Sequence, residues 1–479
     1  MVDWKKDIKL SDFVARNKGE AQAAAPAATT EPPADKQSIW KRELRLRKPT
    51  ARSAAGTAET PVAQTPAPAP VDEPEVAEGS PPVTMRSPLR REISFRRRDK
   101  SAARQSPRPE PKANDKPAVA KRGRKKTSIV GLKVGASQLA AAHVVTNGQP
   151  ELVQVARQPL ERGVVVGGEL RDPEALGAAL KTFFADHKLP SRGVRLGVGT
   201  NRIGVRHFEI SGLQSPEHLE NAVRFRAQEV LPIPLEEAVL DYHVVGESSD
   251  EQGHLTYQVL LVVAYRDLVE RYVQACRLAG LRLVGVDLEA FALLRALSPD
   301  RPRDVESDAA VVVVSIGHDR STFAVSNGLT CEFARVLDWG GGSLDVALAR
   351  TLDLAPSQAE PIKHALTLNA TQERLPGFTQ EQAVAAYEAV RRELHTFVRE
   401  LVSSLHFYQN QQGSLGIGEI LLTGGTAHLP GLAAELQRLT GVTVRVGNPL
   451  ARVEIGKRVD PETQVGSLAV AIGLALEES

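Results

Sequence analysis

Two stretches of the chain combine strand-forming residues with a glycine turn of the kind that faces phosphate groups. The first runs from Ser128 to Val145 and contains GLKVGAS, in which Gly135 opens the turn and Ser137 follows it. Backbone amides in turns of this kind form anion-binding concavities. Ahead of the turn stands Lys133, where phosphate chemistry usually needs a carboxylate to hold a hydrated metal ion. The pattern predicts a phosphate-facing hairpin that carries an unexpected cation.

The same strand–turn–strand pattern occurs again at Ala309–Gly328, with a serine and a glycine at its turn. Two glycine clusters follow, in DWGGGSLDVALAR and LLTGGTAHLPGL. Each cluster has two open interpretations. In one, the glycines let the backbone approach a nucleotide closely. In the other, they serve the fold, as a tight turn or as close packing between strand and helix. The candidate nucleotide-binding residues are Lys133, Gly135, Ser137, Ser315, Gly317, Gly340, Gly341, Gly424, Gly425 and Thr426.

The elements around these turns alternate between strands and helices. Two hairpins in separate lobes, with a Gly-Gly loop at a later strand end, indicate a duplicated α/β fold with a cleft between its halves. Ligands in such folds bind at the carboxyl ends of strands. The predicted elements include strands near 128–134, 139–146, 151–157 and 193–199, a helix near 173–187 and a long helix over Glu381–Asn410.

Charge and proline content divide the chain into an arm and a body. The chain has 60 basic residues (Lys and Arg) and 58 acidic residues (Asp and Glu). Residues 1–127 hold 28 of the basic and 16 of the acidic residues, a net charge of +12. Residues 128–479 hold the other 32 basic and 42 acidic residues, a net charge of −10. Sixteen of the 31 prolines also lie in the arm. Such a segment buries too little apolar surface to offset its ordering entropy, so we expect a disordered arm before a folded body.

Several protein classes are excluded by what the sequence lacks. Cys276 and Cys331 are the only cysteines, too few for a disulfide framework or a Cys-type zinc site. No apolar run reaches the roughly 18 residues of a membrane span. The N-terminal MVDWKKDIKLSDF has no apolar core typical of a signal peptide. We expect a cytoplasmic protein with no metal site and no nucleic-acid partner.

The arm contains three related segments, WKKDIKL at 4–10, WKRELRL at 40–46 and LRREISF at 89–95. Their apolar residues share parity, so in an extended chain they would line one face. Such anchors predict capture of an unidentified partner by strand addition or groove docking, with avidity from three copies. Recurrence through composition alone is the alternative. The predicted anchors are Trp4, Ile8, Leu10, Trp40, Leu44, Leu46, Leu89, Ile93 and Phe95.

The basic run KRGRKK at Lys121–Lys126 joins the arm to the body. One interpretation is a solvated linker. The other is contact with an anionic membrane surface, which attracts clustered Lys and Arg.

Four segments of the body occur in an order and spacing that point to a known family. They are RFRAQEVLPIPLEEAVLDYHVV (Arg224–Val245), VDLEAFALLRAL (Val286–Leu297), LLTGGTAHLPGL (Leu421–Leu432) and the ending SLAVAIGLAL. In these the chain resembles the PilM family of type IV pilus assembly proteins, whose actin-like ATPase fold is related to that of the cell-division protein FtsA.

This resemblance implies a domain organisation for the body and a partner. The implied fold is an actin-like two-lobed α/β fold with a small inserted α/β subdomain. The implied protein lies on the inner face of the membrane, binds the N-terminal cytoplasmic tail of the inner-membrane protein PilN in a groove of the insert, and links it to the assembly motor. The expected boundaries are a first lobe at 128–305, an insert near 207–284, a second lobe at 306–461 and a C-terminal segment at 462–479 that returns to the first lobe.

The phosphate hairpins depart from the family pattern. The first usually reads Gly-Ile-Asp-Ile-Gly-Ser-Ser with a later lysine, and the second Asp-Ile-Gly. Here the aspartate positions hold Lys133 and Ser315, and the lysine position corresponds to Ala140. Because magnesium and phosphoryl transfer depend on carboxylates, we expect no magnesium and no efficient ATP hydrolysis. Three states stay open: ATP held statically by Lys133, an empty or closed cleft, and an ATPase that uses unidentified groups.

Three functions follow, and the first is favoured. It is a scaffold of type IV pilus assembly with degenerate or absent ATP hydrolysis. The second is an active ATPase that drives assembly. The third is an FtsA-like division protein, disfavoured because that family ends in an amphipathic membrane helix and this sequence ends in LALEES. The arm segments also raise the hypothesis that the arm occupies the groove of its own body.

Overall fold

A computed structural model of the 479-residue chain describes the body of the protein. The predicted arm and its nine anchors, Trp4, Ile8, Leu10, Trp40, Leu44, Leu46, Leu89, Ile93 and Phe95, lie outside the described residues. Nearly all of the basic run at 121–126 does too. The described residues are 126–213, 215–231, 233–249, 254–298, 309–368, 375–411, 413–460 and 465–476.

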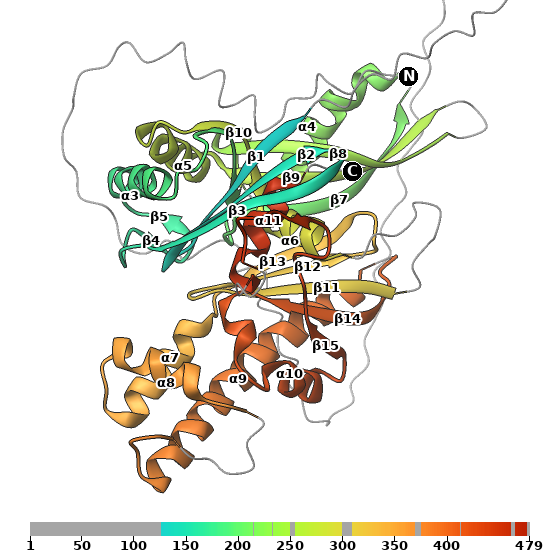
Figure 1. The fold of residues 1–479 in the computed structure, drawn as a ribbon. Coiled ribbons are helices and arrows are strands. Elements are labelled where there is room, and N and C mark those ends of the chain that lie inside the picture. Colours follow the sequence, from blue (N-terminus) through green and yellow to red (C-terminus); the bar gives the residue numbers. More distant parts are fainter. Residues whose placement is uncertain are drawn as a thin grey trace, which may run out of the picture. The chain divides into compact units, whose positions relative to one another are not determined.

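A six-stranded sheet forms the first half of the body (Figure 1). Its strand order is β10-β6-β1-β2-β3-β16, in which β1, β2 and β3 form an antiparallel meander and β6, β10 and β16 pair in parallel with their neighbours. The strands are β1 (Thr127–Val134), β2 (Gln138–Asn147), β3 (Gln149–Pro159), β6 (Arg192–Val198), β10 (Arg282–Leu288) and β16 (Glu454–Ile455).

Two helices cover one face of this sheet. They are α3 (Pro173–Asp186) and α5 (Arg266–Leu278), and their apolar residues share one core with Val130 and Leu132 of β1. The start of α3 follows from its sequence, because the Asp172 side chain accepts a hydrogen bond from the Ala175 amide and proline occupies the first turn. A small hairpin of β4 (Val165–Val166) and β5 (Glu169–Leu170) precedes α3.

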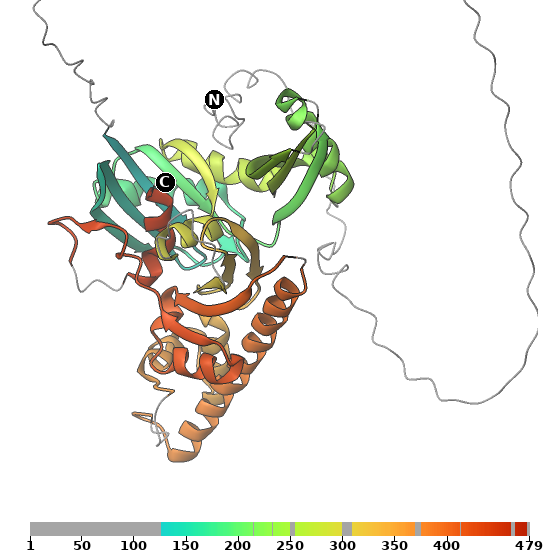
Figure 2. The same cartoon turned by 90° about the vertical axis from the view of Figure 1, so that its right-hand side faces the viewer.

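A five-stranded sheet forms the second half, in the order β13-β12-β11-β14-β15. Alternate residues of β11 pack against four helices on one face, and Figure 2 shows the long helix α9 among them. A capping box of Thr379 and Gln382 begins α9. The strands are β11 (Ala309–Ile316), β12 (Ser321–Ser326), β13 (Cys331–Leu337), β14 (Gly416–Thr423) and β15 (Thr443–Val446), and the helices are α7 (Gly341–Leu352), α8 (Pro356–Ala365), α9 (Gln380–Gln409) and α10 (Leu432–Thr440).

Two helices, α6 (Glu289–Leu297) and α11 (Ala469–Ala475), lie between the two sheets (Figures 1 and 2). They share a core with Val311 and Val313 on the second face of β11. Their close contact with each other and with β1 requires glycine. A Cβ on Gly473 would overlap the Ala292 carbonyl, and one on Gly131 would overlap the Ala471 carbonyl. The residues of β1 that face this central layer include Lys133.

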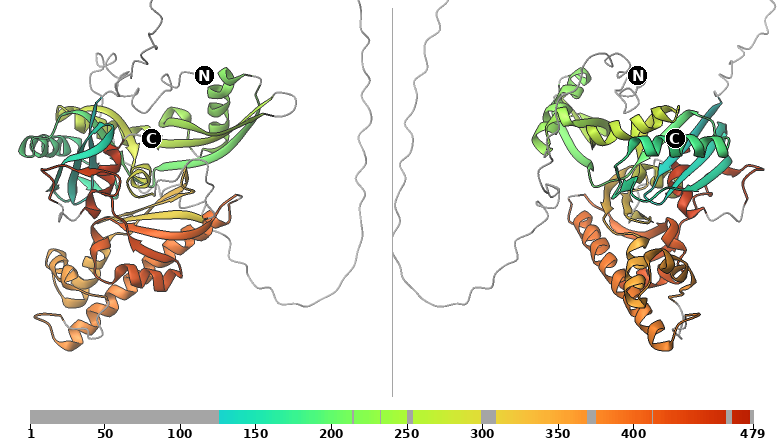
Figure 3. Two further views of the ribbon diagram at one scale, coloured as in Figure 1. Left: turned by 45° about the vertical axis from the view of Figure 1, so that its right-hand side comes forward. Right: turned by 90° about the vertical axis from the view of Figure 1, so that its left-hand side faces the viewer.

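A three-stranded antiparallel sheet, in the order β7-β9-β8, forms the inserted subdomain, coloured green in Figure 3. One face packs on α4, and residues of β9 on the other face join the core of the first half. The elements are β7 (Ile203–Leu213), β8 (Ala238–Ser249), β9 (Leu255–Tyr265), α4 (Leu219–Val230) and two short 3-10 turns, η2 (Pro216–His218) and η3 (Leu235–Glu237).

The insert differs in extent from the predicted range 207–284. Its sheet spans 203–265, whereas α5 and β10 belong to the first half of the body. The physical reason is burial, because the apolar row of α5 packs with α3 while β10 pairs with β6. The C-terminal return also differs from the predicted 462–479, since β16 already pairs with β3. None of the helices in the described part of the chain is long and apolar enough to cross a membrane.

Candidate functional site

Lys133 lies on β1 of the first predicted hairpin and faces the layer between the two sheets. Its direct cross-strand neighbour on β2 is Ala140, the position at which the resembling family has its lysine. On the other side, Lys133 is paired with Gly197 of β6. The cation of this pair of positions therefore lies on β1 and not on β2.

The Lys133 ammonium forms an ion pair with a glutamate that sequence reasoning missed. Its Nζ is 3.4 Å from Oε2 of Glu289, the first residue of α6, and the two side chains are 19% and 9% exposed. Gly199, just after β6, makes room for that carboxylate, because a Cβ there would lie 2.9 Å from Glu289 Cδ. Two charges this well buried require one another, since either alone would remain uncompensated. Lys133 is therefore no free cation for phosphate.

The turn of the first hairpin is closed by its own backbone. The Gly135 amide donates to the Gln138 carbonyl over 2.9 Å, and the Ser137 carbonyl accepts from the Leu160 amide over 2.9 Å. An amide already used inside a turn is not a donor for an anion. Of the three candidates here, Gly135 and Ser137 thus have backbone roles within the fold.

Ser315 of the second hairpin is buried and neutral. It is 3% exposed on the central strand β11, between Thr322 of β12 and Thr423 of β14. The turn beyond it is closed by the Gly317 amide, which donates to the Arg320 carbonyl over 2.9 Å. The second carboxylate position therefore holds a hydroxyl within a row of hydroxyl side chains, with no charge to balance.

The turn of the second hairpin also caps helix α7. The Gly341 amide donates to the Gly317 carbonyl over 2.9 Å, and the Gly342 amide donates to the His318 carbonyl over 2.8 Å. The first amides of a helix have no partner inside the helix and are the usual donors to a bound anion. Here two of them are satisfied by the hairpin itself.

Close packing accounts for two glycines of the first cluster. A Cβ on Gly340 would overlap the His318 carbonyl, and a Cβ on Gly341 would overlap the Thr426 hydroxyl. Thr426 in turn lies within 3.5 Å of the Gly317 carbonyl, to which its hydroxyl donates. These residues bring α7, the second hairpin and the segment after β14 together.

The second glycine cluster contains one packed and one open residue. Gly424 has φ +92°, and a Cβ there would overlap the Ile316 carbonyl. Gly425 begins the 3-10 turn η4 (Gly425–His428), and a Cβ on it would meet nothing within 4 Å. Gly424 is thus required by the fold, whereas packing gives no reason for glycine at Gly425.

The ten candidates therefore form two groups, one on each sheet, and one segment contacts both sheets. This segment is the 3-10 turn η5 (Gly466–Leu468). The Gly466 carbonyl accepts from the Gly424 amide over 3.3 Å, and Arg157 of β3 donates to the Ser467 hydroxyl over 2.9 Å. Lys133, Gly135 and Ser137 belong to the first sheet. The group on the second sheet is Ser315, Gly317, Gly340, Gly341, Gly424, Gly425 and Thr426.

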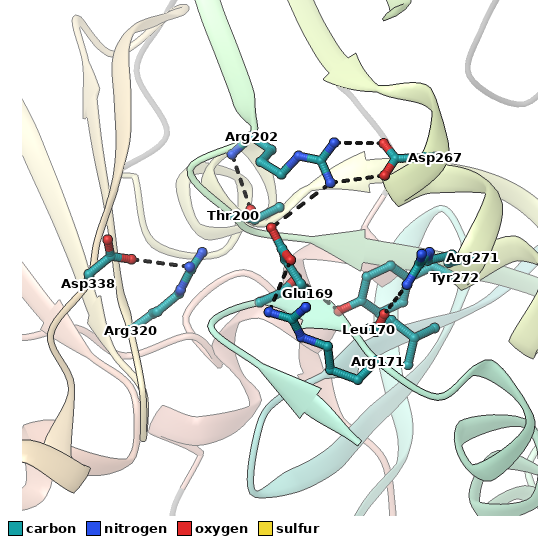
Figure 4. Close-up of polar contacts among 11 residues, drawn as sticks. Glu169, Leu170, Arg171, Thr200, Arg202, Asp267, Arg271, Tyr272, Arg320 and Asp338 are labelled. Atoms are coloured by element: carbon teal, nitrogen blue, oxygen red, sulfur yellow. Dashed lines mark hydrogen bonds and ion pairs between the residues drawn. The ribbon is translucent and has the colours of Figure 1, made fainter. Parts of the chain in front are cut away.

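A second cationic residue, Arg320 at the end of the second turn, lies against the first half of the body (Figure 4). Its Nη2 is 3.1 Å from Asp338 Oδ1, while its Nε and Nη1 are buried without a hydrogen-bond partner. A Cβ on Gly167 or Gly168 would lie within about 3 Å of the guanidinium, at 2.9 and 3.0 Å. Those glycines, between β4 and β5, provide the space that Arg320 occupies.

Figure 4 also shows a polar cluster on the first half. Arg202 forms a bidentate pair with Asp267, at 3.1 and 2.8 Å, and its guanidinium lies 4.1 Å from the centre of the Tyr265 ring. Nearby, the Tyr272 hydroxyl donates to the Gly168 carbonyl over 3.2 Å, and burial followed by the charge of Glu289 raises the pKa of that hydroxyl. These groups satisfy each other and stabilise the β4–β5 hairpin.

The residues present do not fit a hydrated magnesium ion. Lys133 and Ser315 occupy the two carboxylate positions, and Mg²⁺ binds through carboxylates and waters. In the described ranges, no group of three His, Cys, Asp or Glu residues is placed to hold a metal. A cavity of about 30 Å³ lies beside Thr200 and Thr322, has room for about one water, and is lined by none of the ten candidates.

Comparison with known proteins identifies the family. The family model of type IV pilus assembly protein PilM matches residues 131–479. This chain belongs to that family. The solved structure of a PilM-PilN type IV pilus biogenesis complex contains a chain 28% identical to this one, with a TM-score of 0.62 and coverage of 73% of this chain and 98% of that chain. The predicted actin-like α/β fold is confirmed.

Cell-division proteins are also distant relatives. FtsA of Escherichia coli K12 is 28% identical over 363 residues, which cover 67% of this chain and 84% of FtsA. FtsA of Bacillus subtilis is 23% identical over 373 residues, which cover 70% and 81%. The predicted relation between the PilM-type body and FtsA is therefore confirmed.

Proposed function

We propose that this PilM-family protein is a scaffold of type IV pilus assembly that does not turn over ATP. It binds the cytoplasmic tail of an inner-membrane PilN-like protein and so acts peripherally on the inner face of the membrane. The observation that carries the proposal is the ion pair between Lys133 and Glu289. A lysine balanced by a buried carboxylate fills the position at which metal-dependent hydrolysis needs an oxygen ligand.

The second hairpin supports the same conclusion. Its carboxylate position is Ser315, and its turn carbonyls accept from the amides of Gly341 and Gly342 at the start of α7. A nucleotide phosphate would have to displace those hydrogen bonds and also compete with Glu289 for Lys133. Of the three states open from the sequence, a closed cleft is thus favoured over ATP held statically by Lys133.

Similarity to a chain of the PilM-PilN complex supports the choice of partner. For the docking surface we propose the insert, residues 203–265, which carries ten acidic and three basic residues, a net charge of 3 − 10 = −7. Such a surface attracts a basic tail, and charge complementarity raises the association rate and selects against acidic competitors.

A binding measurement tests the partner. The purified full-length chain is titrated with a fluorescent peptide of the N-terminal tail of a PilN-like protein. Exchanging exposed acids of the insert, Glu237→Lys with Glu247→Lys, should weaken binding at least tenfold. Glu388→Lys on the exposed side of α9 is the matched control and should leave the affinity unchanged. Equal loss in both variants, or no binding by the parent chain, would contradict docking on the insert.

A hydrolysis measurement separates the scaffold from the alternative of an active ATPase. Phosphate release by the full chain is measured with ATP and magnesium in excess. The background rate is that of a Lys133→Asp, Ser315→Asp variant measured without magnesium. The full chain should not exceed this background rate. Steady turnover by the parent chain that disappears on Glu289→Gln would favour the ATPase instead. The FtsA-like division role stays the second alternative, because FtsA is related to this chain only distantly.

A further inference from the structure

Strand β8 is an edge of the inserted sheet. The strand order is β7-β9-β8, so β8 pairs on one side only among the described residues. The opposite edge, β7, meets the second sheet, where the His207 ring nitrogen donates to the Cys331 carbonyl over 2.7 Å. An edge strand offers a row of backbone groups to another extended chain.

The two faces of β8 differ in a way that selects the added strand. Leu240, Tyr242 and Val244 point to the α4 side and are only partly buried against its core. Between them, Asp241 is half-buried and His243 is exposed. A matching strand would thus carry alternate apolar residues toward α4 and basic residues on its other face, because directly opposed side chains pair across strands.

The arm segment Trp4–Leu10 has this pattern. Trp4, Ile8 and Leu10 share one parity, with Lys6 as the one charged residue on that face, and Lys5 and Lys9 share the other parity with Asp7 between them. Three lysines and one aspartate give the segment a net charge of +2, against −7 for residues 203–265. The alternation and the charge both complement β8.

The chain between this segment and the body is long enough for it to reach β8. From residue 10 to residue 126 there are 126 − 10 = 116 residues. A chain of that length can span up to about 380 Å when fully extended. Tethering also gives the segment a high effective concentration, well above that of a second copy of the protein at micromolar levels.

We propose that Trp4–Leu10 adds to the outer edge of β8 in its own chain as an extended strand. Trp4, Ile8 and Leu10 continue the apolar row of Leu240, Tyr242 and Val244, and Lys5 and Lys9 lie on the other face of the added strand. This inference rests in part on the proposed function, because it makes the arm a built-in competitor for the acidic surface on which a basic tail docks.

Hydrogen exchange of the full-length chain tests the proposal without any partner tail. The test variant is Trp4→Ala with Trp40→Ala, since Trp40 opens the second copy of the segment. The amides of β8, Ala238–Ser249, should then exchange about tenfold faster, while those of α3 stay unchanged. The control variant, Trp4→Phe with Trp40→Phe, keeps the apolar face and should keep the protection.

Two results would overturn the proposal. One is the same exchange of β8 in the parent chain and the alanine variant. The other is protection of β8 that rises with protein concentration, which would mean docking by a second copy. Because no tail peptide is added, either result leaves the proposed tail binding to be judged by its own titration. Protection that weakens in high salt supports the charge complementarity between arm and insert.

Discussion

The two hairpins of this protein are stabilised in different ways. In the first, Lys133 has a charge partner, Glu289, which lies 3.4 Å away on α6. In the second, the corresponding position holds Ser315, which brings no charge and needs no counterion. The first hairpin thus places a charge pair in the central layer, whereas the second has a neutral, closely packed core.

The difference shows two ways in which one fold stabilises a hairpin turn. A cation in a buried layer is stable only with a matched anion, so the first hairpin depends on a side-chain pair. The second hairpin depends on its backbone, because the Gly317 and His318 carbonyls accept from α7 and three glycines allow close contact. Changes of charge should damage the first hairpin, and changes of volume should damage the second.

The largest effect is expected from added volume at the second hairpin. Gly424→Ala should lower the free energy of unfolding by about 4 kcal/mol, because alanine would be strained at φ +92° and its Cβ would overlap the Ile316 carbonyl. The matched control is Gly425→Ala, whose Cβ would meet nothing and should cost less than about 0.5 kcal/mol. Urea unfolding measures both, and equal losses would contradict the packing argument.

The next effect comes from removing charge at the first hairpin. Lys133→Ala should cost about 3 kcal/mol, because it leaves the Glu289 carboxylate buried without its partner. Adding Glu289→Gln to Lys133→Ala should recover most of that loss, since neither charge then remains. A double-mutant cycle measured by urea unfolding gives the coupling directly. Additive losses at the two sites would mean that the pair contributes nothing.

Much of the fold could be predicted because local patterns determine it. The helix predicted over Glu381–Asn410 is α9 at Gln380–Gln409, and a capping box marks its start. The helix predicted near 173–187 is α3 at Pro173–Asp186, and the Asp172 side chain caps its start. In each case the period of apolar residues and the capping chemistry lie within a few residues of the boundary, where a sequence pattern can register them.

The candidate site was predictable only in part, because its partners come from distant segments. Nothing near Glu289 in the sequence indicates that it pairs with a lysine more than 150 residues earlier. The approach of Arg320 to Gly167 and Gly168 is likewise a tertiary contact. The sequence held only an indirect signal for this pair. A buried lysine on β1 requires an acidic partner, and Glu289, at the start of a helix that follows a parallel strand, was a candidate for it.

A smaller effect is expected at Arg320, which contrasts with Lys133. Its partner Asp338 is 44% exposed, and two guanidinium nitrogens are buried without hydrogen bonds. The desolvation cost of the guanidinium therefore offsets much of what its ion pair contributes. Arg320→Met should change the free energy of unfolding by less than about 1 kcal/mol, as measured by urea unfolding. A loss as large as that of Lys133→Ala would show that both hairpins depend on charge.

The smallest effect is a pH dependence confined to the first hairpin. His143 of β2 lies within 2.8 Å of the Ser128 hydroxyl, and burial lowers its pKa below the usual value of about 6.5. The unfolded chain therefore takes up this proton at a higher pH than the folded chain does. Stability is full above that pH and falls as the pH drops through and below it.

Replacing the imidazole should remove this contribution while leaving the second hairpin unchanged. His143→Gln should flatten the change of melting temperature between pH 7.5 and 5.5 relative to the parent chain. His364→Gln at the end of α8 is the control, because it lies in the second half of the body. If both variants flattened the profile equally, the pH dependence would belong to the whole body. A change in His143→Gln alone assigns it to β2, on the same sheet as the charge pair of Lys133 and Glu289.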